Sequence, residues 1–387
     1  MLDLTFEMNT QNISHTWMTT IQENIIGIEK RSAIYTWPRV SFNNKLYFGD
    51  QDKKRFIRAN FLNNINNTWG IPIVSDRTTL TSTASAGQSS ITVDEATNRH
   101  FYAGRDCVLI SLTDWETYEV ATISAISGTT LTLSGTLDST WPAGTNIYPF
   151  YECRIEQEQT RDVQASNVNS INISARESFE EHRTFSYTLP TIDTDVFPVY
   201  NSLNLFLYKP IDPITELYIH PFSIFGPYGI QSYYSSYGST RAAFKRTFIC
   251  NTRKMIYDLF DFFDAKQGRL GSFYVPTFMG DIIISAEVDS TDLTLTTRKL
   301  YMTADEIVGQ HIYIRLEDKS YVCREITARP STTSITIDTP IGTDIPTADL
   351  KNTLCCFLHE SRFGVDEITY EYYVENIAET KLRFDIL

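Results

Sequence analysis

The chain has 387 residues, with 33 Lys and Arg against 47 Asp and Glu, which gives a formal net charge of −14. Hydrophobic residues make up 42% and aromatic residues 13%, a composition typical of chains that fold around a core and unlike that of disordered chains. At roughly 150 residues per domain the length predicts two or three domains. The excess of acidic residues argues against sequence-specific nucleic acid binding, which needs a basic surface.

The first residues, MLDLTFEMNT, have neither the basic region nor the apolar run of a signal peptide. No apolar stretch reaches the ~18 residues that a membrane span requires, so we expect no membrane insertion and synthesis in the cytoplasm. The cysteines contain no C-x-x-C spacing, and we expect buried, reduced thiols. They are Cys107, Cys153, Cys250, Cys323, Cys355 and Cys356.

Two segments, one in each half, carry the same succession of patterns. In the first, KLYFGD around Phe48 precedes a helical pattern and then the strand-like WGIPI around Pro72. In the second, KRTFIC around Phe248 precedes a helical pattern and then GSFYVPTF around Pro276. Phe48 and Phe248 lie 200 residues apart, and the two prolines 204. This near-constant spacing predicts a duplication.

Apolar residues spaced by three and four predict a short helix in each segment. The apolar positions are Ile57, Phe61 and Ile65 in the first segment, and Met255, Ile256, Leu259, Phe260 and Phe263 in the second. Asp52 and Thr252 stand where N-caps are expected, and Gly70 and Gly268 where the helices are expected to end. Each segment is therefore predicted to fold as strand, helix, strand.

About 70 residues of alternating apolar and polar character follow each segment. Short strands are predicted at SSITVD, RDCVLISL, TYEVATI, TTLTLSGTL and NIYPFYECRI in the first half, and at DLTLTT, HIYIRL, SYVCREI, SITIDTP and TLCCFLHE in the second. The stretches beginning at Gly104 and Gly309 correspond with a spacing of 205. Strands of this length and spacing predict a small antiparallel barrel or sandwich in each half.

The middle of the chain is less regular, and its most informative stretch is PFSIFGPYGIQSYYSSYGST. Its aromatic residues are interleaved with Ser and Gly, a composition that supplies large, rigid contacts. One interpretation is an edge strand packed on its own core, and the other is a subunit interface. The interface candidates are Phe222, Phe225, Tyr228, Tyr233, Tyr234 and Tyr237.

The sequence contains no motif for nucleotide binding, nucleophilic catalysis or metal binding. The six histidines lack ligand spacing, and acidic clusters such as Glu177, Glu180 and Glu181 beside His182 are interpreted as solvated faces. We therefore expect no catalytic residue, no cofactor site and no metal site. Trp17, Trp37, Trp69, Trp115 and Trp141 fit core or turn packing better than a sugar-binding platform.

Each half contains a strand, a short helix and a strand with a Phe/Trp-x-x-Pro ending, followed by an inserted β module. This pattern resembles the minor tail and distal tail proteins of long-tailed bacteriophages and gene transfer agents. The resemblance covers Lys45–Arg154 and Lys245–Arg362. It implies a mainly β (α+β) fold built from a belt unit that carries an inserted module. The implied organisation is a first belt unit (1–79), a first inserted module (80–150), connecting strands with a second belt unit (151–282), a second module (283–357) and C-terminal strands (358–387).

The resemblance also implies a function. Such proteins form homo-oligomeric rings in the virion that join the tail tube to the host-recognition or baseplate apparatus and let DNA pass. The implied partners are the tail tube protein, the tail hub and other tail-tip proteins. Because this chain holds two copies of the unit, three subunits would give a pseudo-six-fold ring and six a larger collar. The alternative is a carbohydrate-binding receptor-recognition module of fibre type, and a polysaccharide-cleaving enzyme is the third possibility.

Overall fold

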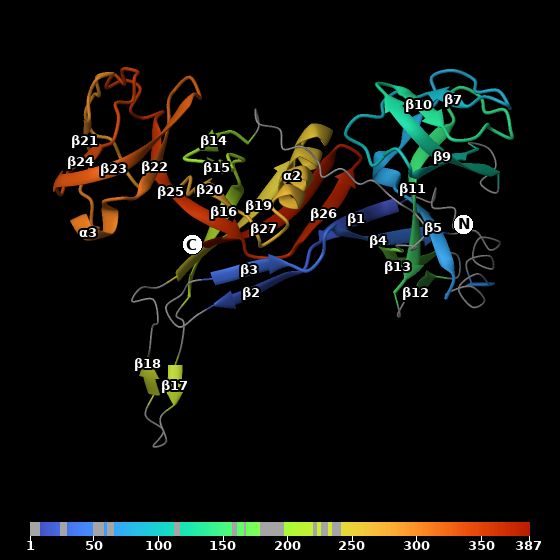
Figure 1. Ribbon diagram of the computed structural model, residues 1–387, viewed down its shortest axis with the longest axis horizontal. Coiled ribbons are helices and arrows are strands. Elements are labelled where there is room, and N and C mark those ends of the chain that lie inside the picture. Colours follow the sequence, from blue (N-terminus) through green and yellow to red (C-terminus); the bar gives the residue numbers. More distant parts are fainter. Residues whose placement is uncertain are drawn as a thin grey trace.

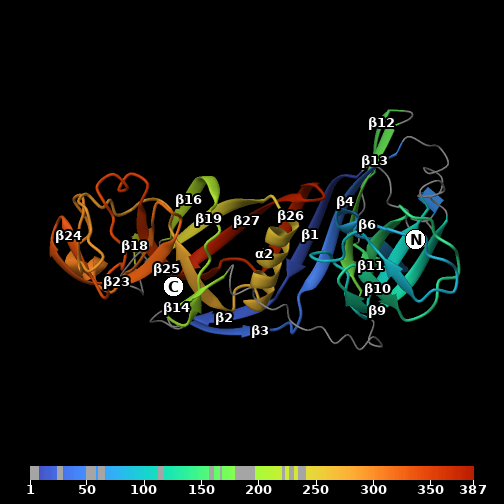
Figure 2. The ribbon, with the colours of Figure 1, turned by 90° about the horizontal axis from the view of Figure 1, so that it is seen from above.

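The computed structural model describes residues 8–23, 29–48, 58–59, 66–111, 117–156, 161–165, 168–178, 197–219, 223–225, 231–233 and 241–387. The chain is mainly antiparallel β (Figure 1), which confirms the predicted class. The central body lies between two smaller β modules at opposite ends of the molecule, as Figure 2 shows from above.

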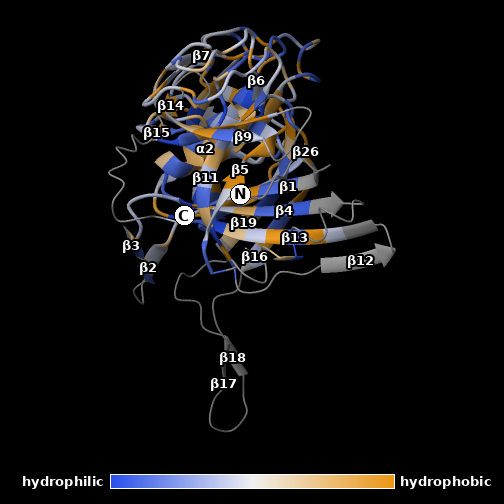
Figure 3. Cartoon of the chain, turned by 90° about the vertical axis from the view of Figure 1, so that its right-hand side faces the viewer, coloured by the Kyte–Doolittle hydropathy of each residue, from blue (hydrophilic) through white to orange (hydrophobic). Residues whose placement is uncertain are grey.

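Eight strands form a continuous antiparallel central sheet in the order β12-β13-β4-β1-β26-β27-β19-β16. Their bounds are β12 Arg161–Ala165, β13 Val168–Glu177, β4 Arg39–Phe48, β1 Met8–Thr16, β26 Glu367–Val374, β27 Ile377–Ile386, β19 Arg241–Cys250 and β16 Ile211–Ile219. Figure 3 shows β1, β4 and β13 side by side in this order. The chain thus contributes four strands from its first half, then four from its second.

A long strand leads from each module into the sheet. β11 (Asn146–Ile155) pairs with β5 (Thr68–Pro72) and with β13. β25 (Leu354–Phe363) pairs with β20 (Ser272–Pro276) and with β27. Pro72 faces Phe150, and Pro276 faces Leu358. The boundaries expected at 150 and 357 therefore fall inside β11 and β25.

The strand registers change one detail of the sequence alignment. Phe48 of β4 faces Asn169, the second residue of β13. Cys250 of β19 faces Ala378, the second residue of β27. By position in their ladders, Phe48 thus corresponds to Cys250, two residues beyond the Phe248 expected from the sequence pattern.

Each module has its own apolar core. The first contains β6 (Thr78–Thr79), β7 (Ser90–Thr92), β8 (Asp106–Ile110), β9 (Tyr118–Ser127) and β10 (Thr130–Leu133). The second contains β21 (Thr294–Thr296), the short helix α3 (Ala304–Ile307), β22 (His311–Arg315), β23 (Tyr321–Ser331) and β24 (Ser334–Ile337). The pairs β8–β9, β9–β10 and β7–β10 have the same antiparallel arrangement as β22–β23, β23–β24 and β21–β24.

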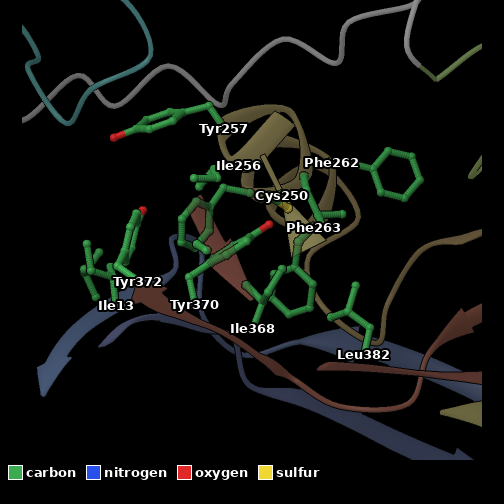
Figure 4. Packing of buried hydrophobic residues seen from close by; sticks show 14 of the residues in the cluster. Ile13, Cys250, Ile256, Tyr257, Phe262, Phe263, Ile368, Tyr370, Tyr372 and Leu382 are labelled. Carbon is green, nitrogen blue, oxygen red and sulfur yellow. The ribbon is translucent and has the colours of Figure 1, made fainter. Parts of the chain in front are cut away.

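Helix α2 (Arg253–Ala265) covers one face of the central sheet. The Thr252 side chain accepts a hydrogen bond from the Met255 backbone N–H at 3.2 Å, as an N-cap does. Gly268, with φ +60°, lies just beyond the helix, and both predictions for this helix are confirmed. Figure 4 shows Ile256 and Phe263 directed toward β26.

Phe262 extends the core to the other side of α2. It points away from β26 (Figure 4) and stacks on Phe197 with ring centroids 4.1 Å apart. The segment after Phe197 contains the small hairpin of β14 (Val199–Tyr200) and β15 (Leu203–Asn204). Because both sides of α2 are covered, its apolar surface is wider than the single face predicted from spacing.

The helix predicted in the first half lies almost entirely outside the described residues, of which Arg58 and Ala59 are helical. Gly70 does not end this helix, since it lies within β5. A Cβ atom at Gly70 would meet the Phe150 ring at 1.7 Å. The glycine is therefore required by close packing against β11, and the predicted helix-ending role was wrong.

A hairpin interrupts each half at a matching place. The first, β2 (Thr19–Glu23) with β3 (Glu29–Ala33), lies between β1 and β4. The second, β17 (Ser223–Phe225) with β18 (Gln231–Tyr233), lies between β16 and β19. Figure 1 shows β2 and β3 running beside the second half, whereas β17 and β18 stand away from the body.

Candidate functional site

The face of the central sheet turned away from α2 is polar. In β1 and β26, Ile13 and Tyr370 are buried on the α2 side, and their neighbours Asn12 and Glu371 lie on the opposite face. One row across five strands consists of Ser174, Asn43, Asn12, Glu371 and Glu379. An antiparallel sheet commonly packs one face on the core and exposes the other to water.

A groove of about 660 Å³ lies on this face, where β1, β26 and β27 meet. Its lining includes Asn12, Thr16, Arg269, Asp366, Glu371 and Lys381. The Lys381 ammonium lies 3.1 Å from the Glu379 carboxylate. Because the lining is polar, carries charges of both signs and contains no aromatic ring, it gives a sugar nothing to stack on.

Below this face, a buried polar joint connects the two halves around Asp264 of α2. The Asp264 carboxylate accepts a hydrogen bond from the Trp17 indole N–H at 2.9 Å and lies 2.8 Å from His15 Nδ1. All three side chains are buried. The Trp17 backbone N–H also donates to the Asp366 carbonyl at 2.7 Å. The end of β1 and the residue that follows it are thus fixed to α2 and to the residue that precedes β26.

A second buried carboxylate, Asp76, lies at the end of the 3₁₀ helix η1 (Val74–Asp76). It pairs with Arg253 and with His100 Nδ1, accepts from the His100 backbone N–H at 2.6 Å, and accepts from the Tyr257 hydroxyl. Asp76 belongs to the first half, His100 to the first module, and Arg253 and Tyr257 to α2. This cluster therefore joins three parts of the chain.

Burial and neighbouring groups set the protonation of this cluster. Burial alone would raise the pKa of Asp76, but contacts with His100, Arg253 and Tyr257 outweigh it and hold this pKa well below its usual value. Burial lowers the pKa of His100, and the Arg253 charge lowers it further. At neutral pH we therefore expect His100 to be neutral and Arg253 to form an ion pair with Asp76. The groove on the polar face and the hollow in the second module are both lined by other residues.

A smaller hollow of about 300 Å³ lies in the second module and is lined by Glu317, Asp318, Asp344 and Asp349, among others. A hydrogen bond from Ser290 lowers the pKa of Asp344. In the part of the chain that the structure describes, no group of His, Cys, Asp and Glu side chains could hold a metal ion.

The predicted interface residues lie in or beside the β17–β18 hairpin. Phe225 and Tyr233 are the end residues of β17 and β18. The other four candidates, Phe222, Tyr228, Tyr234 and Tyr237, lie outside the described residues. Within the described ranges, β17 pairs only with β18, which does not match an edge strand of the central sheet.

The sequence pointed to other residues that the structure places in the core. Trp17, Trp69 and Trp141 are buried, as expected for packing residues, and Trp115 lies outside the described residues. All six cysteines are buried and free, which confirms that prediction, and burial raises the pKa of Cys107 to about 12. No sequence pattern indicates that the His15 and His100 rings lie close together, with centroids 5.9 Å apart, because the two residues come from distant elements.

A comparison with protein-family models and with curated proteins found no match. Among the helices of the described residues, none is long and apolar enough to cross a membrane.

Proposed function

We propose that this chain is a structural protein of a phage tail tip. In this proposal it forms a ring that connects the tail tube to the host-recognition or baseplate apparatus and leaves a passage for DNA. It acts in the virion, without catalysis or a cofactor, and its neighbours are the tail tube protein, the tail hub and other tail-tip proteins.

The observation that supports this most is the tandem order of the central sheet. The four strands β12-β13-β4-β1 are followed by β26-β27-β19-β16, and the two sets have the same order of pairings. We interpret them as two copies of one belt unit, each carrying an inserted β module. A unit that already repeats side by side within one chain is suited to repeat further around a ring.

The polar sheet face and the arrangement of the modules fit the same function. A wall that DNA passes should be polar but should not carry a strongly basic stripe, because basic residues bind phosphates. The row from Ser174 to Glu379 has this character. The modules stand at the two ends of the central body (Figure 2).

The alternative, a carbohydrate-binding module, has less support. Stacking on a sugar needs aromatic rings in a concave site, and neither the groove nor the acidic hollow has an aromatic residue in its lining. Of the tryptophans with described positions, only Trp37 is exposed, at 37%.

The test is electron microscopy and analytical sedimentation of the purified chain and of its parent particle. We expect a closed ring whose subunit contacts bury on the order of 2,000 Å² each. Replacing Tyr233, Tyr234 and Tyr237 with Ala should weaken assembly by roughly 1–2 kcal/mol for each anchor lost, with an unchanged melting temperature.

The matched control is Tyr301→Ala, at a tyrosine of the second module that is 88% exposed. This variant should assemble like the wild type. If the triple variant assembles equally well, or simply unfolds, the aromatic run is not the interface. A chain that is monomeric in its native particle would overturn the ring and favour the sugar-binding alternative.

A further inference from the structure

The strand pairing that joins the two halves of the chain, here called the internal seam, suggests how two chains could pair. At this seam, β1 of the first half pairs antiparallel with β26 of the second, from Gln11 opposite Tyr372 to Thr16 opposite Glu367. Within the described residues, β12 at one end of the sheet pairs only with β13, and β16 at the other end pairs only with β19. By position in the two units, β16 is the counterpart of β1, and β12 is the counterpart of β26.

The β2–β3 hairpin strengthens the internal seam by crossing onto the second half. The Thr19 backbone N–H donates to the Asp366 carboxylate at 3.0 Å, and the Glu29 carboxylate lies 3.3 Å from the Arg362 guanidinium. Its counterpart, β17–β18, has no second half beside it in the same chain. This explains why β17 and β18 stand away from the body in Figure 1.

The ladders fix which residues correspond. In the first half one row runs through Ile155, Ala175, Phe42 and Ile13. In the second half the matching row runs through Phe363, Phe384, Phe244 and Glu216. Glu216 therefore takes the place of Ile13, which faces Tyr370 across the internal seam.

The residue that takes the place of Tyr370 follows in the same way. Tyr370 faces Thr380, four residues before Phe384 of β27, and Arg161 faces Ile171, four residues before Ala175 of β13. Arg161 of β12 is thus the counterpart of Tyr370, and Asp162 is the counterpart of Glu371.

We propose that β16 of one chain pairs antiparallel with β12 of a second copy, in the register of the internal seam. This inference rests on the proposed ring and names the surface that closes it. Thr215 then faces Asp162 of the second copy, and Glu216 faces Arg161. The β17–β18 hairpin lies across the first half of that copy, as β2–β3 lies across the second half of its own chain.

The exposed residues of β16 and the charges in the sequences of β16 and β12 support a second copy as the partner. Glu216 is exposed although its counterpart Ile13 is fully buried, and Tyr218 on the same edge is 70% exposed. A carboxylate on an edge strand discourages pairing with unrelated strands. In the register of the internal pairing, residue 161 of the second copy, an arginine in the sequence, is opposite Glu216, and opposite charges across a strand pair are favourable.

Cross-linking tests the register directly. Directly opposite residues in an antiparallel pair have Cα atoms about 4.5–5.5 Å apart, within the range that a disulfide spans. The full-length Thr215→Cys/Asp162→Cys variant should form covalent oligomers under mild oxidation, seen on non-reducing electrophoresis. Each single variant, and Thr247→Cys/Asp162→Cys with its first cysteine on the internal strand β19, should not. The native cysteines are buried and should add no background.

Charge reversal tests the pair independently. Glu216→Arg or Arg161→Glu alone should weaken association at least about tenfold, because like charges then face each other, and the double reversal should restore it. Equal melting temperatures would exclude misfolding as the cause.

The outcomes separate this inference from the proposed function. If the ring forms but the double-cysteine variant does not cross-link and charge reversal does not change association, the β16–β12 pairing is wrong and the proposed ring remains. A chain that stays monomeric in its native particle would overturn both. Cross-links that extend into open filaments would support the pairing and contradict the closed ring.

Discussion

The buried pair of Arg253 and Asp76 gives the sharpest prediction about how the two halves are held together. The side chains of Arg253 and Asp76 are 6% and 0% exposed. Replacing Arg253 with Met keeps an unbranched apolar stem and removes the charged guanidinium group. Breaking a buried pair by removing one partner costs about 3–5 kcal/mol, because the other charge stays buried. We expect a loss in this range in the free energy of unfolding, measured by urea titration at pH 8.

The size of the loss should depend on pH. Arg253 is one of the groups that lower the pKa of His100, so its removal raises that pKa. His100 then takes up a proton more readily and compensates part of the Asp76 charge. The difference in stability between wild type and variant should therefore be smaller at pH 6 than at pH 8.

The neighbouring residue provides a matched control. Lys254 forms an i,i+4 pair with Asp258, and its side chain is 55% exposed. Lys254→Met should cost no more than about 0.5 kcal/mol. The double variant Asp76→Leu/Arg253→Met should recover part of the loss, because no uncompensated charge remains. If Arg253→Met and Lys254→Met cost the same, the buried pair does not hold the halves together.

Three further predictions concern the same body. Burial lowers the pKa of His100 below 6.5, so on acidification the unfolded chain binds a proton at this histidine before the folded chain does. The free energy of unfolding should therefore fall as the pH drops below about 6.5. His100→Gln should reduce the slope of unfolding free energy against pH by at most about 1.4 kcal/mol per pH unit. Phe262→Ala should cost about 3–5 kcal/mol in urea unfolding, since it empties the space between α2 and Phe197; a loss below 1 kcal/mol would contradict that packing. Segments 81–144 and 289–344 both begin and end beside backbone hydrogen bonds, so each can be replaced with a short Gly/Ser linker. Replacing 81–144 also removes His100 from the joint. It should therefore lower the melting temperature of the central body more than replacing 289–344 does. Circular dichroism melts giving equal losses would mean that His100 does not contribute to the joint.

Local patterns in the sequence were enough to predict much of the fold. Strand alternation predicted the mainly β class, because side chains in a strand point to opposite faces in turn. Helix α2 and its Thr252 cap followed from apolar spacing and one hydrogen-bonding side chain, both properties of adjacent residues. The spacing of Pro72 and Pro276 matched the strand pairing. The expectation of buried, free cysteines also followed from sequence, since no spacing suited a metal or a disulfide.

Only the tertiary structure decided how these elements combine. The register of β4 against β13 corrected the position of Phe48, because a ladder is set by partners far away in the chain. Gly70 was misread because the Phe150 ring, which requires it, comes from a strand some 80 residues later. The joint of Asp76, His100 and Arg253 has no sequence motif, since its members are brought together only when the two halves pack. Among the described strands, the edge positions of β12 and β16 likewise follow only from the complete set of strand pairings, because an edge strand is defined by having a neighbour on one side alone.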